Sequence, residues 1–441
     1  MQATTENLKM DIASLKALLA TGKLSLHELV ESIYEKAEAF SGYNIWIHLL
    51  PKEAVLARVS QLEQVDQSRL PLYGLPYAVK DNIDVAGIPT TAACPAFSYV
   101  PNVSAEVVQL LEDSGALLIG KTNLDQFATG LVGTRSPYGA VKNSYNKEYI
   151  SGGSSSGSAV AVALGLVSFS LGTDTAGSGR VPAGFNNIIG LKPTKGVIST
   201  QGVVPACKSL DCVSIFALNG EDAEFVLDIA AGKKRDKLNN YSSKENFTFA
   251  VPGISQLNFF GNTEYATLYQ QAIEKFQMAG GKLKEIDFSP FLETAALLYE
   301  GPWVAERLAS IKDFFDSNSD DLLQETKAII EGAKNFTAVD TFLSLYKLDE
   351  LKSITDGLLQ NIDFLLLPTS PTIYKIEEIK NDPIQLNKNL GYYTNFVNLL
   401  NLSALAVPYG FQNNGLPMGV TLIAGAYADK KLIQLAKNLT P

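Results

Sequence analysis

Few side chains in this sequence can act as a nitrogen base at neutral pH. The 441 residues include two histidines, His27 and His48, both near the N-terminus. His27 falls in an amphipathic helical stretch and His48 in an apolar, strand-like run, so we expect structural roles for both. A Ser-His-Asp triad and a histidine-based metal site are therefore disfavoured. Any hydrolytic chemistry in this chain must use another base, and lysine is the remaining nitrogen base.

Three residues are candidates for such chemistry. Lys80 ends an apolar run in GLPYAVKDN, so its ammonium group is expected to be buried. Ser154 lies in SGGSSSGS and Ser178 in GTDTAGSGR. Taken singly, they have ordinary interpretations as a lysine at a strand edge, a helix N-cap and a tight turn. The small residues of 130–205 could also form a flexible linker, but apolar, helical or strand-like segments follow each run directly.

The three candidates belong to one long pattern. The run GGSSSGSAVAVALGLVSFSLGTDTAGSGRVPA resembles the signature of the amidase signature family, and the resemblance is dense over residues 70–220. It implies that Ser178 is the nucleophile, Ser154 a bridging serine and Lys80 the base. It also implies a cis, non-proline peptide bond before Ser154.

The residue types suit the chemistry that the resemblance implies. A serine hydroxyl is a weak nucleophile until a base takes its proton. Lysine has an unperturbed pKa of about 10.4, so Lys80 must be neutralised by burial to act at pH 7. Ser154 would relay the proton between Lys80 and Ser178, and onward to the leaving ammonia.

The negative oxygen of a tetrahedral intermediate needs preorganised donors. The small residues after GTD allow a concave nest of backbone N–H groups. The candidate oxyanion-hole residues are Thr175, Ala176, Gly177 and Ser178. Asp174 and Arg180 flank this loop, and we expect them to hold it rather than to react.

Two further segments indicate the substrate. VPACKSLDCVSIFA (204–217) looks like the allophanate hydrolase branch of the family, and Tyr299 and Arg307 in YEGPWVAERL match that branch's substrate-anchoring pair. Gly301 and Pro302 are typical of a helix start, which would place Tyr299 just before a helix and Arg307 about one and a half turns into it. An arginine can grip a carboxylate through two parallel bonds.

The resemblance thus implies hydrolysis of the terminal amide of allophanate (urea-1-carboxylate), with release of ammonia through an acyl-enzyme, in urea degradation. Gly130, in the ATGLVG loop, is a further candidate for backbone contacts to the substrate. No cofactor and no metal are expected.

Other functions stay open. A second amidase of the family could act on a small carboxylate-bearing amide such as malonamate with the same residues. A glutaminase-type subunit of a tRNA amidotransferase would need partner subunits, and segment 204–217 argues against it. A binding module built on an inactive amidase is disfavoured because Lys80, Ser154 and Ser178 are all present.

The elements that must position these residues follow an α/β pattern. We expect the amidase signature fold, a central mixed β-sheet flanked by helices on both faces. Predicted strands are 44–50, 77–80, 116–119, 167–171, 247–251, 363–367, 404–407 and 420–423. Predicted helices are 8–21, 25–40, 51–65, 105–113, 155–165, 221–230, 264–279, 302–315, 320–332 and 338–359. Residues 1–70 should form a helical segment packed on a catalytic domain spanning 71–441.

Two other stretches have local interpretations. GALLIGKT (115–122) matches the P-loop pattern, but its variable positions are apolar and are predicted to be the strand itself rather than a phosphate-binding loop. GKKRDKLNNYSSKEN (232–246) is the most polar stretch and is predicted to be a linker or surface loop.

Composition excludes several classes. The 36 basic and 46 acidic residues give a net charge of −10 with no evident basic stripe, which disfavours direct nucleic-acid binding. The most apolar run, 158–172, is too short for a membrane span and contains Gly165. The three cysteines are too few for a disulfide framework, and no signal peptide is visible, so a reducing cytoplasm is expected.

The resemblance also implies partners. The family tends to form homodimers, and the helices within 8–40 are a plausible interface. Allophanate hydrolases usually carry a further C-terminal domain, and some are fused to a biotin-dependent urea carboxylase. We expect that domain to be absent here, so that the chain would perform the first half of the breakdown and would be coupled functionally to both.

Overall fold

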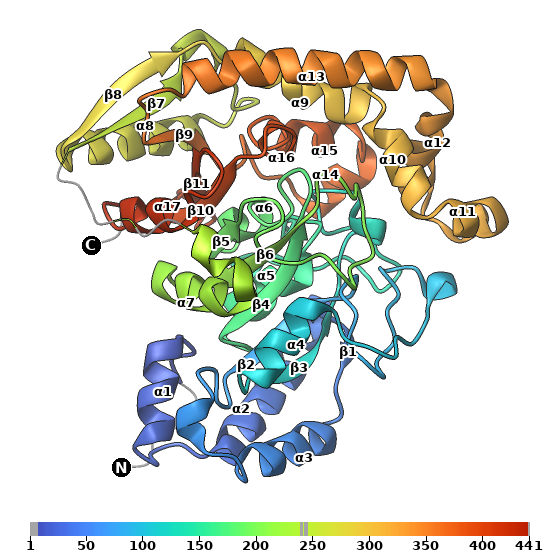
Figure 1. The fold of residues 1–441 in the computed structure, drawn as a ribbon, viewed down its shortest axis with the longest axis vertical. Helices are drawn as coiled ribbons and strands as arrows, with labels where there is room; N and C mark the ends of the chain where they lie inside the picture. Colours follow the sequence, from blue (N-terminus) through green and yellow to red (C-terminus); the bar gives the residue numbers. More distant parts are fainter. Residues whose placement is uncertain (1–7, 239–240, 242–245, 440–441) are drawn as a thin grey trace.

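The computed structural model describes residues 8–238, 241 and 246–439. An eleven-stranded sheet runs through this part of the chain in the order β1-β3-β2-β4-β6-β5-β10-β11-β9-β7-β8, with parallel and antiparallel pairs. Helices flank the sheet (Figure 1). The predicted α/β class with a central mixed sheet is confirmed.

The strands lie where apolar residues cluster. They are β1 (Trp46–Leu49), β2 (Pro76–Lys80), β3 (Leu117–Thr122), β4 (Phe169–Asp174), β5 (Ile189–Lys192), β6 (Cys212–Ala217), β7 (Phe247–Pro252), β8 (Gly281–Ile286), β9 (Phe364–Pro368), β10 (Ser403–Phe411) and β11 (Pro417–Ala424). All predicted strands are confirmed. The sequence did not predict β5, β6 or β8: β5 spans only four residues, and β8 is an edge strand with mainly polar, exposed side chains.

The α-helices of the described residues are α1 (Ile12–Ala20), α2 (Leu26–Ala39), α3 (Lys52–Leu62), α4 (Glu106–Asp113), α5 (Ser156–Ala163), α6 (Val181–Phe185), α7 (Gly220–Ala230), α8 (Thr263–Met278), α9 (Ser289–Glu300), α10 (Trp303–Ser310), α11 (Lys312–Asn318), α12 (Gln324–Glu331), α13 (Ala338–Leu358), α14 (Ile376–Asn381), α15 (Gln385–Leu390), α16 (Phe396–Leu399) and α17 (Asp429–Ala436). The capping box predicted between Ser25 and Glu28 is present at the start of α2. None of the described helices is long and apolar enough to cross a membrane.

The helix predictions around Arg307 were only partly correct. The single helix predicted over 302–315 is broken into α10 and α11 at Ile311. Tyr299 lies just before α10, which carries Arg307, as predicted, but it is also in the last turn of α9, a helix that the sequence did not predict. The chain turns at Gly301, where a Cβ atom would lie 2.4 Å from the Leu297 carbonyl oxygen, so only glycine fits this approach.

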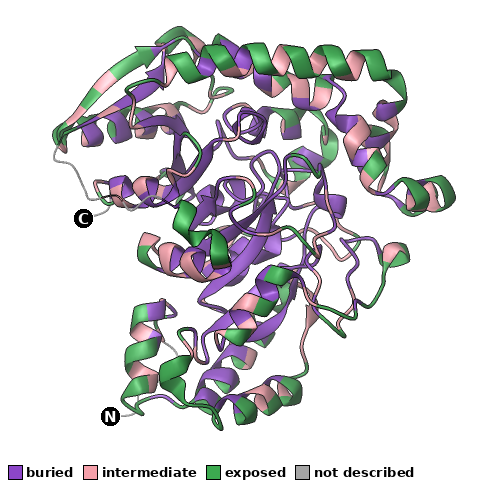
Figure 2. Ribbon diagram, in the orientation of Figure 1, coloured by how far each residue is buried: buried purple, intermediate pink, exposed green. Residues whose placement is uncertain are grey.

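The glycine- and serine-rich centre of the sequence is the interior of the protein rather than a linker. Helix α5 consists of Ser, Gly, Ala and Val, and almost all of it is buried (Figure 2). A Cβ atom on Gly157 would lie 2.3 Å from the Ile45 carbonyl oxygen, so the small residue lets the helix approach the neighbouring backbone. The same crowding is why larger side chains are absent there.

The N-terminal segment joins the sheet directly. Strand β1 pairs antiparallel with β3, and the Ile12 amide donates to the Asp222 carboxylate on α7. The division at residue 70 stays a prediction. The P-loop match is confirmed as a strand, because its lysine, Lys121, lies in β3 and pairs with Asp81 at 3.1 Å.

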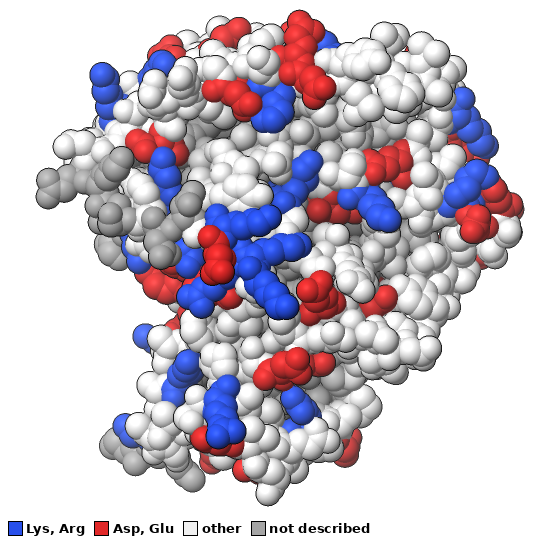
Figure 3. Space-filling model, viewed as in Figure 1, with Lys and Arg blue, Asp and Glu red and all other residues white. Residues whose placement is uncertain are grey.

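The polar stretch 232–246 falls only partly within the described residues, because 239–240 and 242–245 lie outside them. Its first part, Gly232–Lys237, is a 3-10 helix whose charged side chains are exposed, as expected for a surface segment. Four of its residues are basic, and Lys and Arg gather on this face of the molecule near α7 (Figure 3). No basic stripe is evident in the sequence, so this local group of basic side chains, among which acidic side chains are interspersed, was not predicted.

Candidate active site

The sheet brings the three predicted catalytic residues together. Strands β2 and β4 are parallel neighbours, so their carboxyl ends meet at one edge of the sheet. Lys80 is the last residue of β2, Ser178 lies in the loop between β4 and α6, and Ser154 lies just before α5. The peptide bond between Gly153 and Ser154 is cis, as the resemblance implied.

A chain of hydrogen bonds connects the three side chains. Lys80 Nζ donates to Ser154 Oγ at 2.8 Å, and Ser154 Oγ donates to Ser178 Oγ at 2.9 Å. Lys80 Nζ also donates to Thr173 Oγ1 at 2.7 Å, an acceptor on β4 that the sequence did not identify. Because hydroxyl groups rotate, the same distances permit protons to pass from Ser178 toward Lys80 when its amine is neutral.

Lys80 meets the electrostatic requirement for a base. Its side chain is fully buried, and this burial lowers its pKa from 10.5 to about 7. The carboxylates of Asp125, Asp211 and Asp174 oppose the shift because they favour the charged form. At neutral pH, a large fraction of Lys80 is therefore able to accept a proton.

The loop that carries Ser178 is held by Asp174. Its carboxylate accepts the amides of Gly177 (3.0 Å) and Gly179 (2.9 Å). It also accepts Nε (2.9 Å) and Nη2 (3.0 Å) of the buried Arg180. Burial alone would raise the pKa of Asp174, but the Arg180 guanidinium, together with Lys192 and the Gly179 amide, holds it below its ordinary value. Asp174 and Arg180 thus hold the loop, as expected.

The four predicted oxyanion-hole amides are not equivalent. The Gly177 amide is engaged with Asp174, whereas in the described part of the chain the amides of Thr175, Ala176 and Ser178 have no hydrogen-bond acceptor. These three amides are therefore the ones whose N–H groups could donate to a bound oxygen.

A carboxylate that the sequence did not single out supports the same loop. Asp211 accepts the Thr175 hydroxyl at 2.5 Å and the amides of Ala206 (2.9 Å) and Cys207 (3.2 Å). Burial raises the pKa of Asp211 to about 6. Asp211 thereby joins segment 204–211 to the loop that carries Ser178.

The predicted substrate-anchoring pair is also brought together. Arg307 on α10 is 3% exposed, and its guanidinium carbon lies 5.4 Å from the ring centroid of Tyr299 at the end of α9. Arg307 Nη1 donates to Thr129 Oγ1 at 3.1 Å, and Nη2 is 3.5 Å from the Tyr299 hydroxyl. Beside this arrangement lies a cavity of about 340 Å³ whose lining includes Tyr299 and Arg135.

Gly130 directly follows Thr129 in this loop. A Cβ atom at Gly130 would lie 2.7 Å from the Asp125 carboxylate, so a side chain does not fit. That carboxylate accepts the amides of Val132 and Gly133, and the Asp125 amide donates to the Ser154 carbonyl. Asp125 therefore connects the Gly130 loop to the backbone at Ser154.

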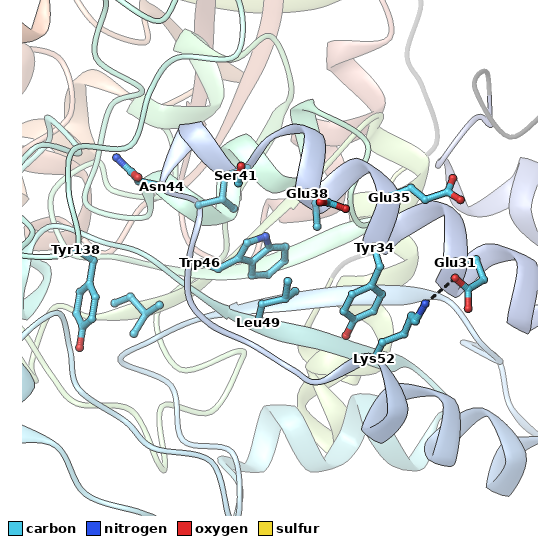
Figure 4. Close-up of a pocket in the computed structure, with 13 residues that line it drawn as sticks. Glu31, Tyr34, Glu35, Glu38, Ser41, Asn44, Trp46, Leu49, Lys52 and Tyr138 are labelled. Carbon is cyan, nitrogen blue, oxygen red and sulfur yellow. Dashed lines mark hydrogen bonds and ion pairs between the residues drawn. The ribbon is translucent and has the colours of Figure 1, made fainter.

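A separate groove of about 700 Å³ lies between α2 and β1. Its walls carry Glu31, Glu35 and Glu38 from the helix and Trp46 from the strand (Figure 4). None of the predicted site residues lines it, so the groove is not part of the candidate active site. No group of His, Cys, Asp and Glu side chains suited to a metal ion occurs among the described residues.

The fold and the site together define a class. The chain belongs to the amidase signature family, whose amidase model matches residues 28–433, and it is an amidohydrolase. The predicted family resemblance is confirmed.

Several known proteins are similar to this chain in sequence or in structure. The urea amidolyase of Saccharomyces cerevisiae is 49% identical over 424 residues, which are 93% of this chain and 23% of that protein. Kluyveromyces lactis allophanate hydrolase is similar in structure, with a TM-score of 0.92 and 44% identity over 99% of this chain and 73% of that one. A glutamyl-tRNA(Gln) amidotransferase subunit of Sulfolobus acidocaldarius is 30% identical over 462 residues, 96% of each chain. The chain spans about a quarter of the length of the urea amidolyases it matches.

Proposed function

We propose that this chain hydrolyses the terminal amide of allophanate and releases ammonia, in urea degradation. The observation that carries the proposal is the hydrogen-bonded series Lys80–Ser154–Ser178, which ends on a lysine with a pKa of about 7. A buried arginine, Arg307, would hold the carboxylate of the substrate. The similarity to urea amidolyase and allophanate hydrolase supports the choice of substrate.

The reaction follows from the positions of these groups. Neutral Lys80 takes the proton of Ser154, which takes the proton of Ser178, while Ser178 Oγ bonds to the amide carbon. The carbonyl oxygen becomes negative and is stabilised by the free amides of the 175–178 loop. The C–N bond then breaks, and the proton returns through Ser154 to the leaving nitrogen, which departs as ammonia.

The acyl-enzyme on Ser178 is released by water. Lys80, again neutral, accepts the proton of the attacking water through Ser154, and the ester bond to Ser178 Oγ breaks as its proton returns. The product keeps the carboxylate that Arg307 holds. We also propose that the chain works together with a urea carboxylase and a further allophanate hydrolase domain, and that it forms a homodimer; the name urea amidolyase of its relatives fits the first coupling.

A second candidate is an amidase for a carbon analogue such as malonamate. It is supported by Arg307, since a guanidinium recognises the carboxylate and not the group that links it to the amide. A glutaminase-type component of an amidotransferase is less well supported, because the identity to the Sulfolobus acidocaldarius protein is 30% and that to urea amidolyase is 49%.

The test is ammonia release by the purified chain from allophanate, malonamate, biuret and glutamine, measured side by side. We expect turnover of allophanate above the other three, and none by Ser178→Ala, which should fold normally. Preference for malonamate or glutamine would replace the proposed substrate. Full activity of Ser178→Ala would remove the nucleophile.

A further inference from the structure

Arg307 is a buried arginine that is not paired with a carboxylate in the described part of the chain. Its side chain is buried, and its Nε has no hydrogen-bond partner among the described residues. It makes no ion pair with any of these residues, although Asp211 and Glu306 favour its charged form from a greater distance. A buried guanidinium without a carboxylate is costly unless a ligand supplies the negative charge. The shorter of the two hydrogen bonds that Arg307 makes with described residues is the one from Nη1 to Thr129 Oγ1, at 3.1 Å.

Thr129 is in turn held from three directions. It is 1% exposed, and its hydroxyl donates to the Phe127 carbonyl at 3.1 Å. Its amide donates to the Gln126 carbonyl at 3.0 Å. Its carbonyl accepts Nη1 of the buried Arg135 at 2.9 Å, whose Nη2 donates to the Pro383 carbonyl at 2.7 Å. The hydroxyl that meets Arg307 therefore has a defined position.

The bond to Thr129 selects which donors of Arg307 remain for a ligand. Thr129 engages one of the two N–H groups of Nη1, whereas Nε has no partner within the described ranges and the contact of Nη2 to Tyr299 is long at 3.5 Å, so the Nε–Nη2 edge is the least engaged part of Arg307. Arg180 shows what this edge does elsewhere in the molecule, because its Nε and Nη2 bind both oxygens of Asp174 at 2.9 and 3.0 Å. Such paired bonds match the planar shape of a carboxylate.

We propose that Thr129 is a positioning residue that orients Arg307, so that its Nε–Nη2 edge receives the carboxylate of the substrate, and that Thr129 thereby sets the preference for carboxylate-bearing amides. The inference rests on the proposed role of Arg307 as the carboxylate anchor. Arg135 contributes to the position of Thr129, because its Nη1 donates a hydrogen bond to the Thr129 carbonyl oxygen.

The test is the variant Thr129→Val, which keeps the shape of the side chain and removes the hydroxyl. KM and kcat are measured with malonamate and with a neutral amide of similar size, such as butyramide. We expect KM for malonamate to rise about tenfold with little change in kcat, since one oriented charge-assisted bond is worth about that factor. KM for butyramide should not change. The separate variant Thr129→Ser keeps the hydroxyl and should therefore show the wild-type KM and kcat with both amides.

Controls separate positioning from a general loss of structure. Thr355→Val removes an equally buried hydroxyl that bonds only within α13, and it should leave both substrates unaffected. If Thr129→Val does not fold, Thr129→Ala is measured in the same way. The inference would be overturned if Thr129→Val raised KM equally for both amides. It would also be overturned if Thr129→Ser did not keep the wild-type KM for malonamate.

The variant Arg307→Ala distinguishes this inference from the proposed function. If Arg307→Ala discriminates between malonamate and butyramide and Thr129→Val does not, the positioning role of Thr129 is wrong and the anchor stands. If Arg307→Ala does not discriminate either, the anchor itself is wrong and the inference falls with it.

Discussion

We expect Lys80→Met to abolish turnover. We also expect the free energy of unfolding of this variant, measured relative to the wild type, to be higher at neutral pH than at alkaline pH. The native state holds Lys80 with a pKa of about 7, whereas an unfolded lysine has the ordinary value of 10.5. Between these values the unfolded chain binds more protons than the native chain, so the wild-type free energy of unfolding rises with pH. Relative to a chain without this lysine, the wild-type free energy of unfolding is highest above about pH 10.5, and this advantage is lost as the pH falls through about 7. Methionine has a similar length and no proton to bind.

The size of the effect follows from the two pKa values. The full shift, from 10.5 to about 7, corresponds to about 5 kcal/mol at about 1.36 kcal/mol per unit. Between pH 7 and about pH 9.5 the free energy of unfolding of the wild type should rise by about 3 kcal/mol more than that of Lys80→Met. The rise is smaller than the full value mainly because about pH 9.5 is still below the pKa of unfolded lysine, 10.5, and in part because native Lys80 is already half neutral at pH 7. The loss of the hydrogen bonds to Ser154 and Thr173 also costs stability, but that cost is the same at both pH values.

The assay is denaturant unfolding of both proteins at pH 7 and about pH 9.5, with ammonia release measured in parallel. The quantity compared is the difference between wild type and variant, in which titrations common to both proteins cancel. A difference that stays constant with pH would show that Lys80 keeps an ordinary pKa in the native state, and the reasoning from burial would be refuted. Turnover by Lys80→Met near the wild-type rate would refute its role as base.

Two further predictions concern activity. The kcat/KM of the wild type should rise about tenfold per pH unit below about pH 7 and level off above it, as Lys80 loses its proton; a rate that still climbs beyond about pH 9 would contradict this. Arg307→Ala should raise KM for malonamate about a hundredfold, because it removes two charge-assisted bonds, and should change KM for butyramide little. Equal increases for both amides would make Arg307 structural.

The sequence predicted the sheet best where strands are apolar and buried. Strands β2, β4 and β9 are completely buried, and their apolar runs were recognised. Strand β8 was missed because it is an edge strand with a largely polar sequence, so its pairing with β7 is a tertiary contact that no local pattern reports. Helix α9 and the break between α10 and α11 at Ile311 were also missed, whereas the start of a helix after Gly301 was predicted.

The candidate site shows the same division. The residues of the triad were named from the signature, and the fold places Ser154 Oγ 2.8 Å from Lys80 Nζ and 2.9 Å from Ser178 Oγ, because parallel strands share one edge. Thr129, Asp125 and Asp211 were not named, because threonine and aspartate have no distinctive local pattern. Their roles come from partners that are distant in sequence; Thr129 and Arg307 are 178 residues apart.

The sequence by itself determined the family, the α/β class, the residues able to react and the absence of a usable histidine. These are properties of residue type and order. The tertiary structure decided the pKa of Lys80, which depends on its burial, and the engagement of the Gly177 amide with Asp174. It also decided that Arg307 Nη1 donates to Thr129 while Arg307 Nε has no hydrogen-bond partner among the residues that the structure describes. Burial, orientation and unpaired charge arise only when distant segments pack together.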